Sequence, residues 1–369
     1  MNKYNIGILG ATGTVGQKFI TLLENHPWFE IKILAASKNS AGKTFEESVK
    51  KRWIMNSPIP EKCKNLIIMD AVKDAEKIAS EVDFVFCALS MDKSEIKTLE
   101  ETYAKLECPV ISNNSANRMA CDVPMIIPEI NAEQMDIIPY QKNRLKTKRG
   151  FIAVKSNCSI QCYVPALHPL FEFGIKNILV CTYQAISGAG KNFDTWPEMK
   201  DNIIPYISGE EEKSEIEPLK IWGKIENGKI VLNSKIKITS QCLRVPVSDG
   251  HTAAVFASFE NTPEINDIIK KLKDFKGHKK SQNLPSSTGQ FIHYFEDSSR
   301  PQIKLDRNLE NGMGISVGRM REDSQYDIKF VCMSHNTVRG AAGGAILLAE
   351  MLCREGYINK ITKSEVVLL

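Results

Sequence analysis

The chain has 369 residues, of which 43% are hydrophobic and 25% are charged, and its formal net charge is +4. This composition is typical of a soluble globular protein long enough for two domains, and it indicates neither a nucleic-acid-binding protein nor a membrane protein. The first residues enter a strand pattern without a signal-peptide core, and the ten cysteines follow no disulfide framework. We therefore expect a cytoplasmic protein.

In the first half of the chain, strand patterns alternate with helix patterns. Strands are predicted at residues 5–9, 30–36, 83–88 and 109–112, and helices at residues 15–24 and 93–105. Such alternation builds β-α-β units, which form a mostly parallel sheet covered on both faces. The first half is therefore predicted to be a Rossmann-type α/β domain.

A glycine-rich loop joins the first predicted strand to the first predicted helix. Gly10, Gly13 and Gly16 follow a variant of the dinucleotide-binding spacing, in the strand-to-helix context that this motif requires. The second strand is followed by Ser37 and Ser40, with a lysine nearby and no acidic residue for a ribose 2′-hydroxyl. Hydroxyls and a cation suit a 2′-phosphate, so the predicted cofactor is NADP rather than NAD.

Cys158 lies where an apolar strand pattern at residues 151–154 passes into an apolar-periodic helix pattern. At the first turn of a helix, the positive end of the backbone dipole favours the thiolate form of a cysteine. A small buried hydrophobic residue explains this segment equally well. Cys162 is interpreted as a packing residue, and the pair has no second cysteine pair or histidine nearby, so no metal site is predicted. Pro165 and Pro169 are expected to kink or shorten the helix.

From residue 151 onward the pattern changes to longer strand-like segments. They are predicted at residues 178–185, 236–245, 253–259, 313–319 and 327–333. Charged or Gly/Pro/Asn-rich segments separate them, which favours an α+β domain with a largely antiparallel sheet. A helix at residues 337–354 begins with small residues and is predicted to end before Gly356.

Two further blocks in this half carry reactive or charged side chains. Gln184 ends a predicted strand in a glycine-rich turn, and Arg244 and His251 lie seven residues apart across a predicted loop. A histidine can act as a proton shuttle, and an arginine can bind an anionic group. Together with a reactive cysteine and a nicotinamide cofactor, they suit redox chemistry on an aldehyde or acyl group that passes through a thioester.

Five segments of the chain closely resemble the aspartate-β-semialdehyde dehydrogenase family. They are residues 10–16 (GATGTVG), 156–159 (SNCS), 184–188 (QAISG), 244–251 (RVPVSDGH) and 336–343 (NTVRGAAG). The segments occur in the family order over nearly the whole chain, which makes the set highly specific. Arg300-Pro301 and the segment at residues 316–319 resemble the archaeal and fungal branch of the family most.

This resemblance implies NADPH-dependent reduction of L-aspartyl 4-phosphate to L-aspartate 4-semialdehyde and phosphate, in the biosynthesis of lysine, methionine and threonine. The implied catalytic residues are Cys158 as acyl-accepting nucleophile, His251 as general acid/base and Gln184 as the residue that orients the acyl group. The implied substrate-binding residues are Arg244 for the α-carboxylate, Glu210 for the α-ammonium group, Arg118 and Lys213 for the phosphate, and Asn157. The choice of Glu210 over Glu211 or Glu212 is left open.

The resemblance also implies the cofactor site and the architecture. The implied cofactor-binding residues are Gly10, Thr12, Gly13, Thr14, Val15, Ser37, Ser40, Ser187, Gly188 and Asn336. The implied fold is like that of glyceraldehyde-3-phosphate dehydrogenase. Its NADP-binding domain would span residues 1–155, completed by a C-terminal helix at about 336–356, and its catalytic and dimerisation domain residues 156–335. A homodimer or homotetramer without nucleic acid, membrane or metal is expected.

Two other functions stay open at this point. An acyl-CoA reductase of the malonyl-CoA type would keep Cys158 and His251 but use a CoA thioester instead of an acyl phosphate. A non-catalytic dinucleotide sensor would bind the cofactor without turnover, although it has no need for a nucleophile beside an acid/base.

Overall fold

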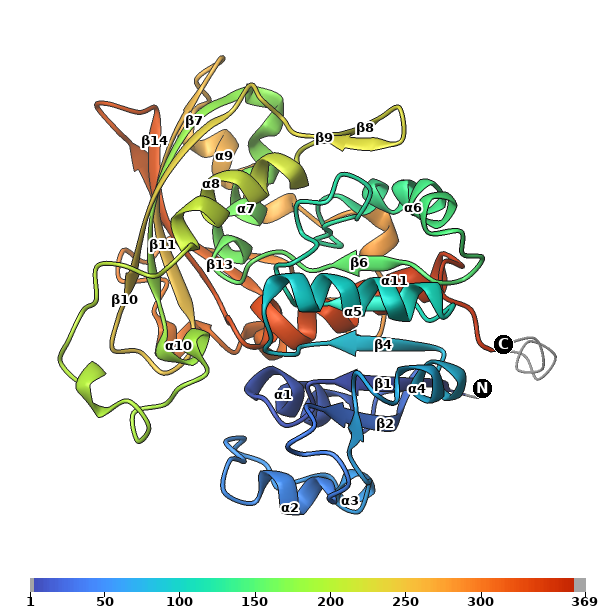
Figure 1. The fold of residues 1–369 in the computed structure, drawn as a ribbon. Helices are drawn as coiled ribbons and strands as arrows, with labels where there is room; N and C mark the ends of the chain where they lie inside the picture. The colour runs from blue at the N-terminus through green and yellow to red at the C-terminus, as the bar shows by residue number, and fades with distance from the viewer. Residues whose placement is uncertain (1–2, 362–369) are drawn as a thin grey trace.

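The computed structural model describes residues 3–361, which form two six-stranded sheets (Figure 1). The first sheet has the strand order β3-β2-β1-β4-β5-β6, and all five of its strand pairs are parallel. Its strands are β1 (Tyr4–Leu9), β2 (Phe29–Ala36), β3 (Met69–Asp70), β4 (Phe84–Cys87), β5 (Val110–Ser112) and β6 (Ile152–Val154). The predicted parallel α/β sheet is confirmed.

Helices cover both faces of this sheet because its strands are apolar on both sides. In β4, Phe84 and Phe86 belong to the hydrophobic cluster of α1 and α11, whereas Val85 and Cys87 belong to the cluster of α4 and α5. The helices are α1 (Thr14–Leu23), α2 (Phe45–Val49), α3 (Glu61–Lys64), α4 (Ala75–Glu81), α5 (Lys93–Lys105), α6 (Ile138–Leu145) and α11 (Gly343–Arg354).

The C-terminal helix α11 therefore packs on the first sheet although it follows the second sheet in sequence. The predicted helix at residues 337–354 is observed as a π-helical turn, Val338–Ala342, followed by α11. Every α11 residue from Gly343 to Cys353 is buried, which explains why the segment is built from small and apolar residues. The predicted boundary between domains at residues 155/156 stays a prediction.

The second sheet is mixed, with the order β10-β7-β11-β14-β13-β12. Its strands are β7 (Ile175–Gln184), β10 (Lys237–Arg244), β11 (His251–Phe259), β12 (Ile292–Phe295), β13 (Ile315–Glu322) and β14 (Ile328–Ser334). The three inner pairs are antiparallel as predicted, whereas β10 and β12 join the two edges in parallel. A separate hairpin is formed by β8 (Lys224–Glu226) and β9 (Lys229–Val231).

Helices α7 (Ile160–Leu167), α8 (Glu210–Ile221) and α9 (Ile265–Asp274) lie on the side of this sheet that faces the first sheet (Figure 1). The short α10 spans Ile303–Asp306. Short 3₁₀ segments occur at Ala132–Ile137, His168–Phe173, Ile186–Ala189, Pro197–Met199, Lys279–Ser281 and Leu309–Gly312. As expected from Pro169, α7 stops at Leu167 and continues as a 3₁₀ turn.

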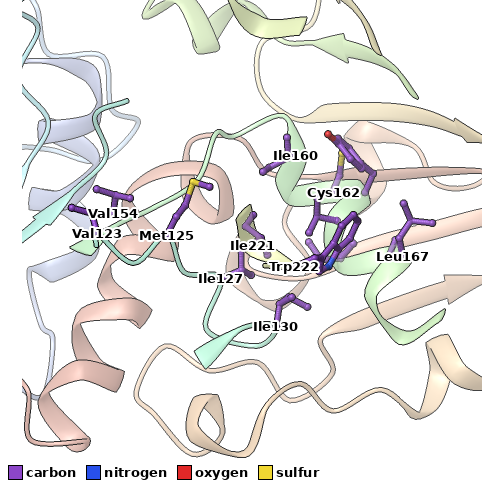
Figure 2. Packing of buried hydrophobic residues seen from close by; sticks show 14 of the residues in the cluster. Val123, Met125, Ile127, Ile130, Val154, Ile160, Cys162, Leu167, Ile221 and Trp222 are labelled. Carbon is purple, nitrogen blue, oxygen red and sulfur yellow. The ribbon is translucent and has the colours of Figure 1, made fainter. Parts of the chain in front are cut away.

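A shared hydrophobic core joins the two sheets around α7. Figure 2 shows Met125, Ile127 and Val154 from the first half packed with Ile160 and Trp222 from the second half. Val154 and Ile160, which flank the turn that carries Cys158, both belong to this core, so both ends of the turn are anchored in it. Within residues 3–361, no helix is long and apolar enough to span a membrane.

Candidate active site

Cys158 lies in the turn that connects β6 to α7. The Asn157 side-chain oxygen accepts hydrogen bonds from the backbone N–H of Ser159 (2.7 Å) and from its hydroxyl (2.7 Å), which fixes this turn. Ser159 is the N-cap of α7, so Cys158 immediately precedes the helix, at the positive end of its dipole. Burial raises the pKa of the Cys158 thiol, and the Glu210 carboxylate raises it further. Formation of the Cys158 thiolate therefore depends on positive potential around the sulfur, which the N-terminus of α7 and the cations of the site can supply.

His251 faces the cysteine from the start of β11. Its Nε2 lies 3.5 Å from Cys158 Sγ, and its Nδ1 accepts a hydrogen bond from the backbone N–H of Ala185 (3.1 Å). Because Nδ1 is an acceptor, the neutral ring carries its proton on Nε2, toward the sulfur. Burial and the nearby Arg244 lower the pKa of His251 to about 3, so the imidazole is neutral near pH 7.

Arg244 reaches the same place because β10 pairs with β7 in parallel. Arg244 lies opposite Gln184 at the carboxyl ends of these strands, and its Nη1 donates to the Ala185 carbonyl (2.7 Å). A Cβ on Gly188 would lie 2.8 Å from Arg244 Nη1 and 3.2 Å from His251 Nε2. Glycine at residue 188 therefore leaves room between the arginine and the histidine.

Glu210, the first residue of α8, closes the other side of the site. Its carboxylate accepts hydrogen bonds from Asn157 Nδ2 (3.0 Å) and Gln184 Nε2 (3.3 Å), and it forms an ion pair with Lys213 Nζ (2.7 Å). Burial opposes ionisation of Glu210, but Lys213 and the two amides outweigh it and hold the pKa below its usual value. Glu211 instead binds Gln241 Nε2 (2.8 Å), and Glu212 is exposed.

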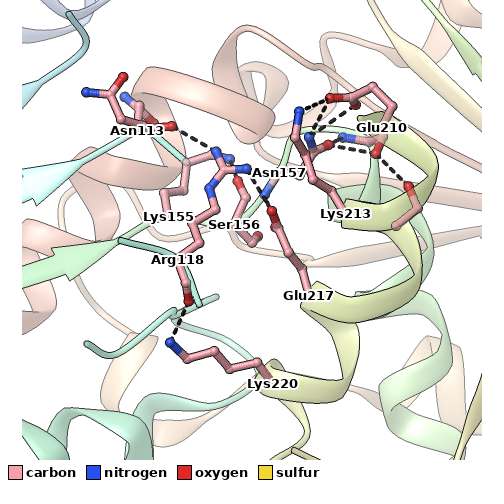
Figure 3. Close-up of polar contacts among 12 residues, drawn as sticks. Asn113, Arg118, Lys155, Ser156, Asn157, Glu210, Lys213, Glu217 and Lys220 are labelled. Carbon is pink, nitrogen blue, oxygen red and sulfur yellow. Dashed lines mark hydrogen bonds and ion pairs between the residues drawn. The ribbon is translucent and has the colours of Figure 1, made fainter. Parts of the chain in front are cut away.

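Arg118 lies in the loop after β5, beside the cysteine turn. Its Nη1 donates to Glu217 Oε1 (2.9 Å) and its Nη2 to the Asn113 carbonyl (2.8 Å), while its Nε is buried without a partner. Glu217 also accepts the backbone N–H of Asn157 (2.6 Å). Figure 3 shows the two ion pairs along α8: Glu210 with Lys213 near the start of the helix, and Glu217 with Arg118 further along it.

Glu217 and Lys155 are buried charged residues of this region that are absent from the predicted site. The sequence does hold one signal for Glu217, because it follows Glu210 by seven residues and so lies on the same face of α8. Lys155 offers no comparable signal, since a lysine after a strand is most often exposed. The predicted packing role of Cys162 is confirmed, because this side chain is fully buried.

The glycine-rich loop connects β1 to α1 as predicted. The backbone N–H groups of Gly10 and Ala11 both donate to the Ala35 carbonyl at the end of β2 (2.8 and 3.0 Å). Gly10 has φ +92°, and a Cβ there would lie 2.4 Å from the Ala88 carbonyl oxygen. Gly13, the N-cap of α1, is exposed and provides no side chain to cap the helix, so the first N–H groups of α1 are free of a side-chain cap.

The remaining predicted cofactor residues surround this loop. Thr12, Thr14 and Val15 are half-exposed, whereas Ser37 is exposed and Ser40 is buried in the turn after β2. Asn336 Nδ2 donates to Ser187 Oγ (2.9 Å). A Cβ on Gly190 would lie 3.6 Å from Thr14 Oγ1, so the turn at residues 187–190 lies between the glycine loop and the cysteine centre.

These residues fit a dinucleotide. A helix N-terminus without a side-chain cap, reached through an exposed glycine, suits a pyrophosphate. The turn after β2 offers hydroxyls and no carboxylate to a 2′-phosphate. Among the described residues, no group of three His, Cys, Asp or Glu side chains could hold a metal ion.

Comparison with known proteins agrees with this arrangement. The family model "Semialdehyde dehydrogenase, NAD binding domain" matches residues 5–138, and "Semialdehyde dehydrogenase, dimerisation domain" matches residues 167–339. The aspartate-semialdehyde dehydrogenase of Archaeoglobus fulgidus is 40% identical over 96% of this chain and 100% of its own length. The aspartate-semialdehyde dehydrogenase of Saccharomyces cerevisiae is 40% identical over 95% of this chain and 98% of its own length.

A solved structure agrees as well. Aspartate semialdehyde dehydrogenase with NADP from Candida albicans has a TM-score of 0.86 and 37% identity, over 97% of this chain and 100% of that chain. The predicted resemblance, enzyme class and fold are thus confirmed: the chain belongs to the aspartate-semialdehyde dehydrogenase family.

Proposed function

We propose that this chain catalyses the NADPH-dependent reduction of L-aspartyl 4-phosphate to L-aspartate 4-semialdehyde and phosphate, and the reverse reaction. In the cell it would serve the biosynthesis of lysine, methionine and threonine. The observation that carries this proposal is the 3.5 Å approach of Cys158 Sγ to His251 Nε2, between a buried arginine and a buried glutamate.

The charges around the cysteine select an α-amino acid. Arg244 ends β10, and Glu210 begins α8. The Gln184 side chain donates a hydrogen bond to Glu210, and Gln184 lies opposite Arg244 in the pairing of β7 with β10. A guanidinium suits an α-carboxylate through two parallel hydrogen bonds, and a carboxylate suits an α-ammonium group. A zwitterionic substrate would thereby present its side-chain carbonyl to Cys158.

The phosphate group would be held by Arg118 and Lys213. Each cation is paired with a carboxylate of α8, so an incoming phosphate would have to share or replace these ion pairs. The unpartnered Nε of Arg118 leaves one donor unused. Asn157 connects the two pairs, since its side chain binds Glu210 and its backbone N–H binds Glu217.

The chemistry would proceed in two steps on Cys158. In the first step, Cys158 attacks the acyl carbon as the thiolate, the C–S bond forms, and the C–O bond to phosphate breaks so that phosphate leaves with the bonding electron pair. In the second step, reduction of the thioester carbonyl gives a tetrahedral oxyanion on Cys158, which Nε2–H of His251 stabilises by a hydrogen bond. The C=O bond then re-forms as the C–S bond breaks, which releases the semialdehyde and returns the Cys158 thiolate. NADPH, when bound, supplies the hydride.

The glycine loop at residues 10–16 would bind the pyrophosphate of NADP, and Ser37 and Ser40 the 2′-phosphate. Ser187, Gly188 and Asn336 would lie toward the nicotinamide end, because their turn joins the loop to the cysteine centre.

The assembly would be a homodimer or homotetramer formed through the second sheet. The dimerisation-domain match spans this sheet. Leu179 and Cys181 of β7 and Phe256 of β11 are half-exposed on the face away from α7, and Tyr183 is exposed there. A cytoplasmic location stays a prediction.

An assay of NADP reduction with aspartate semialdehyde tests the proposed reaction. We expect the rate to depend on inorganic phosphate and not on CoA. Turnover that requires CoA and not phosphate would instead indicate an acyl-CoA reductase. Tight NADPH binding without turnover of any acyl substrate would indicate a sensor.

A further inference from the structure

Glu217 is a buried carboxylate that contacts two parts of the centre at once. The residue is 2% exposed, its Oε1 accepts a hydrogen bond from Arg118 Nη1 (2.9 Å), and its Oε2 accepts one from the backbone N–H of Asn157 (2.6 Å). Arg118 belongs to the loop after β5, whereas Asn157 belongs to the nucleophile turn (residues 156–159) and directly precedes Cys158. One carboxylate therefore joins the arginine proposed to bind phosphate to the turn that carries the sulfur.

Helix α8 holds the nucleophile turn through residues that share one face of the helix. Besides the contact from Glu217, the Glu210 carboxylate accepts a hydrogen bond from the Asn157 side chain (3.0 Å), and Ser214 Oγ lies 3.3 Å from Ser159 Oγ. Steps of four and then three residues bring the three α8 side chains to the same face of the helix. The helix is thus fixed to the nucleophile turn at three points.

A proline inside α8 strengthens the contact between α8 and α7. Pro218 has no N–H to donate to the Ser214 carbonyl four residues earlier, and the Tyr163 hydroxyl of α7 donates to that carbonyl instead (2.7 Å). Tyr163 and Ser214 are both fully buried. Because this contact does not involve Glu217, we expect α8 to keep its place on α7 when Glu217 is substituted.

The loop that carries Arg118 is held on α8 as well. Lys220, three residues after Glu217, donates its ammonium group to backbone carbonyls of this loop, those of Arg118, Ala120 and Val123 (Figure 3). The backbone of the loop is therefore fixed, whereas the guanidinium lies at the end of a long side chain. Its two described contacts are Glu217 and the Asn113 carbonyl (2.8 Å), and its Nε has no partner within residues 3–361.

We propose that Glu217 is a positioning residue for the phosphate step, which fixes the Arg118 guanidinium relative to the nucleophile turn. This role deepens the proposed function, because it rests on Arg118 binding the phosphate. The bond to Cys158 and the bond to phosphate share one acyl carbon, so the phosphate must be held at a fixed distance from the sulfur. The ion pair with Glu217 is formed through Nη1, which leaves Nε for a phosphate oxygen while the ion pair persists.

The test is the initial rate of NADP reduction by the full-length protein at varied inorganic phosphate and varied aspartate semialdehyde. Glu217→Gln keeps the shape of the side chain but removes its charge and leaves one acceptor oxygen for two donors. We expect the phosphate KM to rise about tenfold and the semialdehyde KM to rise less than about threefold. Glu217→Asp keeps the charge but is one methylene group too short to reach both partners, so it should raise the phosphate KM as well.

A double-mutant cycle with Arg118 separates positioning from a general loss of structure. Arg118→Ala alone should raise the phosphate KM about 10–100-fold, and adding Glu217→Gln should raise it by no more than about a further twofold, because Glu217 acts through Arg118. Arg118→Lys keeps a cation beside Glu217 and replaces the alanine variant if that variant does not fold. Glu212→Gln makes the same charge change at an exposed residue of α8, and both of its KM values should match the parent protein.

Several results would overturn the positioning role while the proposed function stands. They are a parent-like phosphate KM in either folded Glu217 variant, an equal rise in both KM values, and additive effects in the double-mutant cycle. A lower phosphate KM in Glu217→Gln would also overturn it, because the carboxylate would then only compete with phosphate for Arg118. Turnover of the parent protein that does not depend on phosphate would instead refute the proposed function, and the role of Glu217 with it.

Discussion

The glycine loop at residues 10–16 and the cysteine centre both lie at the carboxyl ends of parallel strands, yet they are held in different ways. The loop is one continuous stretch whose shape follows from its own glycines and from a backbone carbonyl of β2. The centre is assembled from β6, β7, β10, β11 and α8, and long-range side-chain contacts hold it. A substitution in the loop should therefore change only the binding of the cofactor. A substitution in the centre should disturb several neighbouring side chains at once.

The largest effect is expected at the nucleophile. Cys158→Ser should reduce turnover by at least about 10³-fold, because the acyl-enzyme cannot form, and it should leave NADPH affinity nearly unchanged. Steady-state rates and a fluorescence titration with NADPH measure the two properties. Cys121→Ser, at an exposed cysteine, is the control. Retained activity would refute the thioester, and lost NADPH binding would refute the independence of the two regions.

A pair of glycine variants tests the loop. Gly10→Ala should destabilise the protein by about 1–3 kcal/mol, because its φ is +92° and a Cβ would meet the Ala88 carbonyl. Gly13→Ala meets its nearest heavy atom at 3.5 Å, so no steric clash arises, and stability should fall by no more than about 1 kcal/mol while the NADPH dissociation constant rises. Urea unfolding measures the stability of each variant, and titration with NADPH measures its dissociation constant. Unchanged NADPH affinity in a folded Gly13→Ala variant would contradict the assignment of this loop.

Arg244→Lys tests how the centre recognises the substrate. Loss of the two-pronged contact should raise the semialdehyde KM about 10–100-fold, equivalent to about 1.5–3 kcal/mol, with a smaller change in the phosphate KM. Initial rates at varied semialdehyde and phosphate give both constants. An equal rise in both KM values would mean that Arg244 supports the whole centre rather than the α-carboxylate.

The smallest effect concerns stability and pH. Burial lowers the pKa of His168 to about 4 and that of His251 to about 3, below the usual value of 6.5. The unfolded chain then binds more protons than the folded chain between about pH 6.5 and these values, so stability falls as pH falls through this window. From pH 7 to pH 5 each histidine should cost on the order of 1–2 kcal/mol.

His168 separates this effect from catalysis, since it lies at the end of α7 beside Phe171 and Phe275. His168→Leu should flatten the pH dependence of the urea midpoint without changing kcat/KM. An unchanged slope would show that the buried histidines do not govern acid stability.

The loop could be predicted from the sequence because its determinants are local. Gly10, Gly13 and Gly16 lie within seven residues, and the adjoining strand and helix have clear periodicity. The same locality makes the strand-to-helix turn of Cys158 predictable, whereas the charged groups around its sulfur come from distant segments.

The rest of the centre depends on contacts that no local pattern encodes. The parallel pairing of β10 with β7 brings Arg244 beside Gln184 across 60 residues of chain. Glu210 and Glu211 differ only in their direction around α8, and this direction decides which of them reaches Asn157. Family resemblance implies these residues. Glu217 is indicated only by its seven-residue spacing from Glu210, and the burial of Lys155 is visible only in the structure.

The most direct test of the account is the mass of the enzyme during turnover. The protein is mixed with aspartate semialdehyde and NADP in phosphate-free buffer and quenched with acid. We predict one added aspartyl acyl group, located on the peptide that contains Cys158, and its loss when phosphate is supplied before the quench. An unmodified Cys158 in enzyme that turns over once phosphate is added, or an acyl group on another residue, would contradict the account.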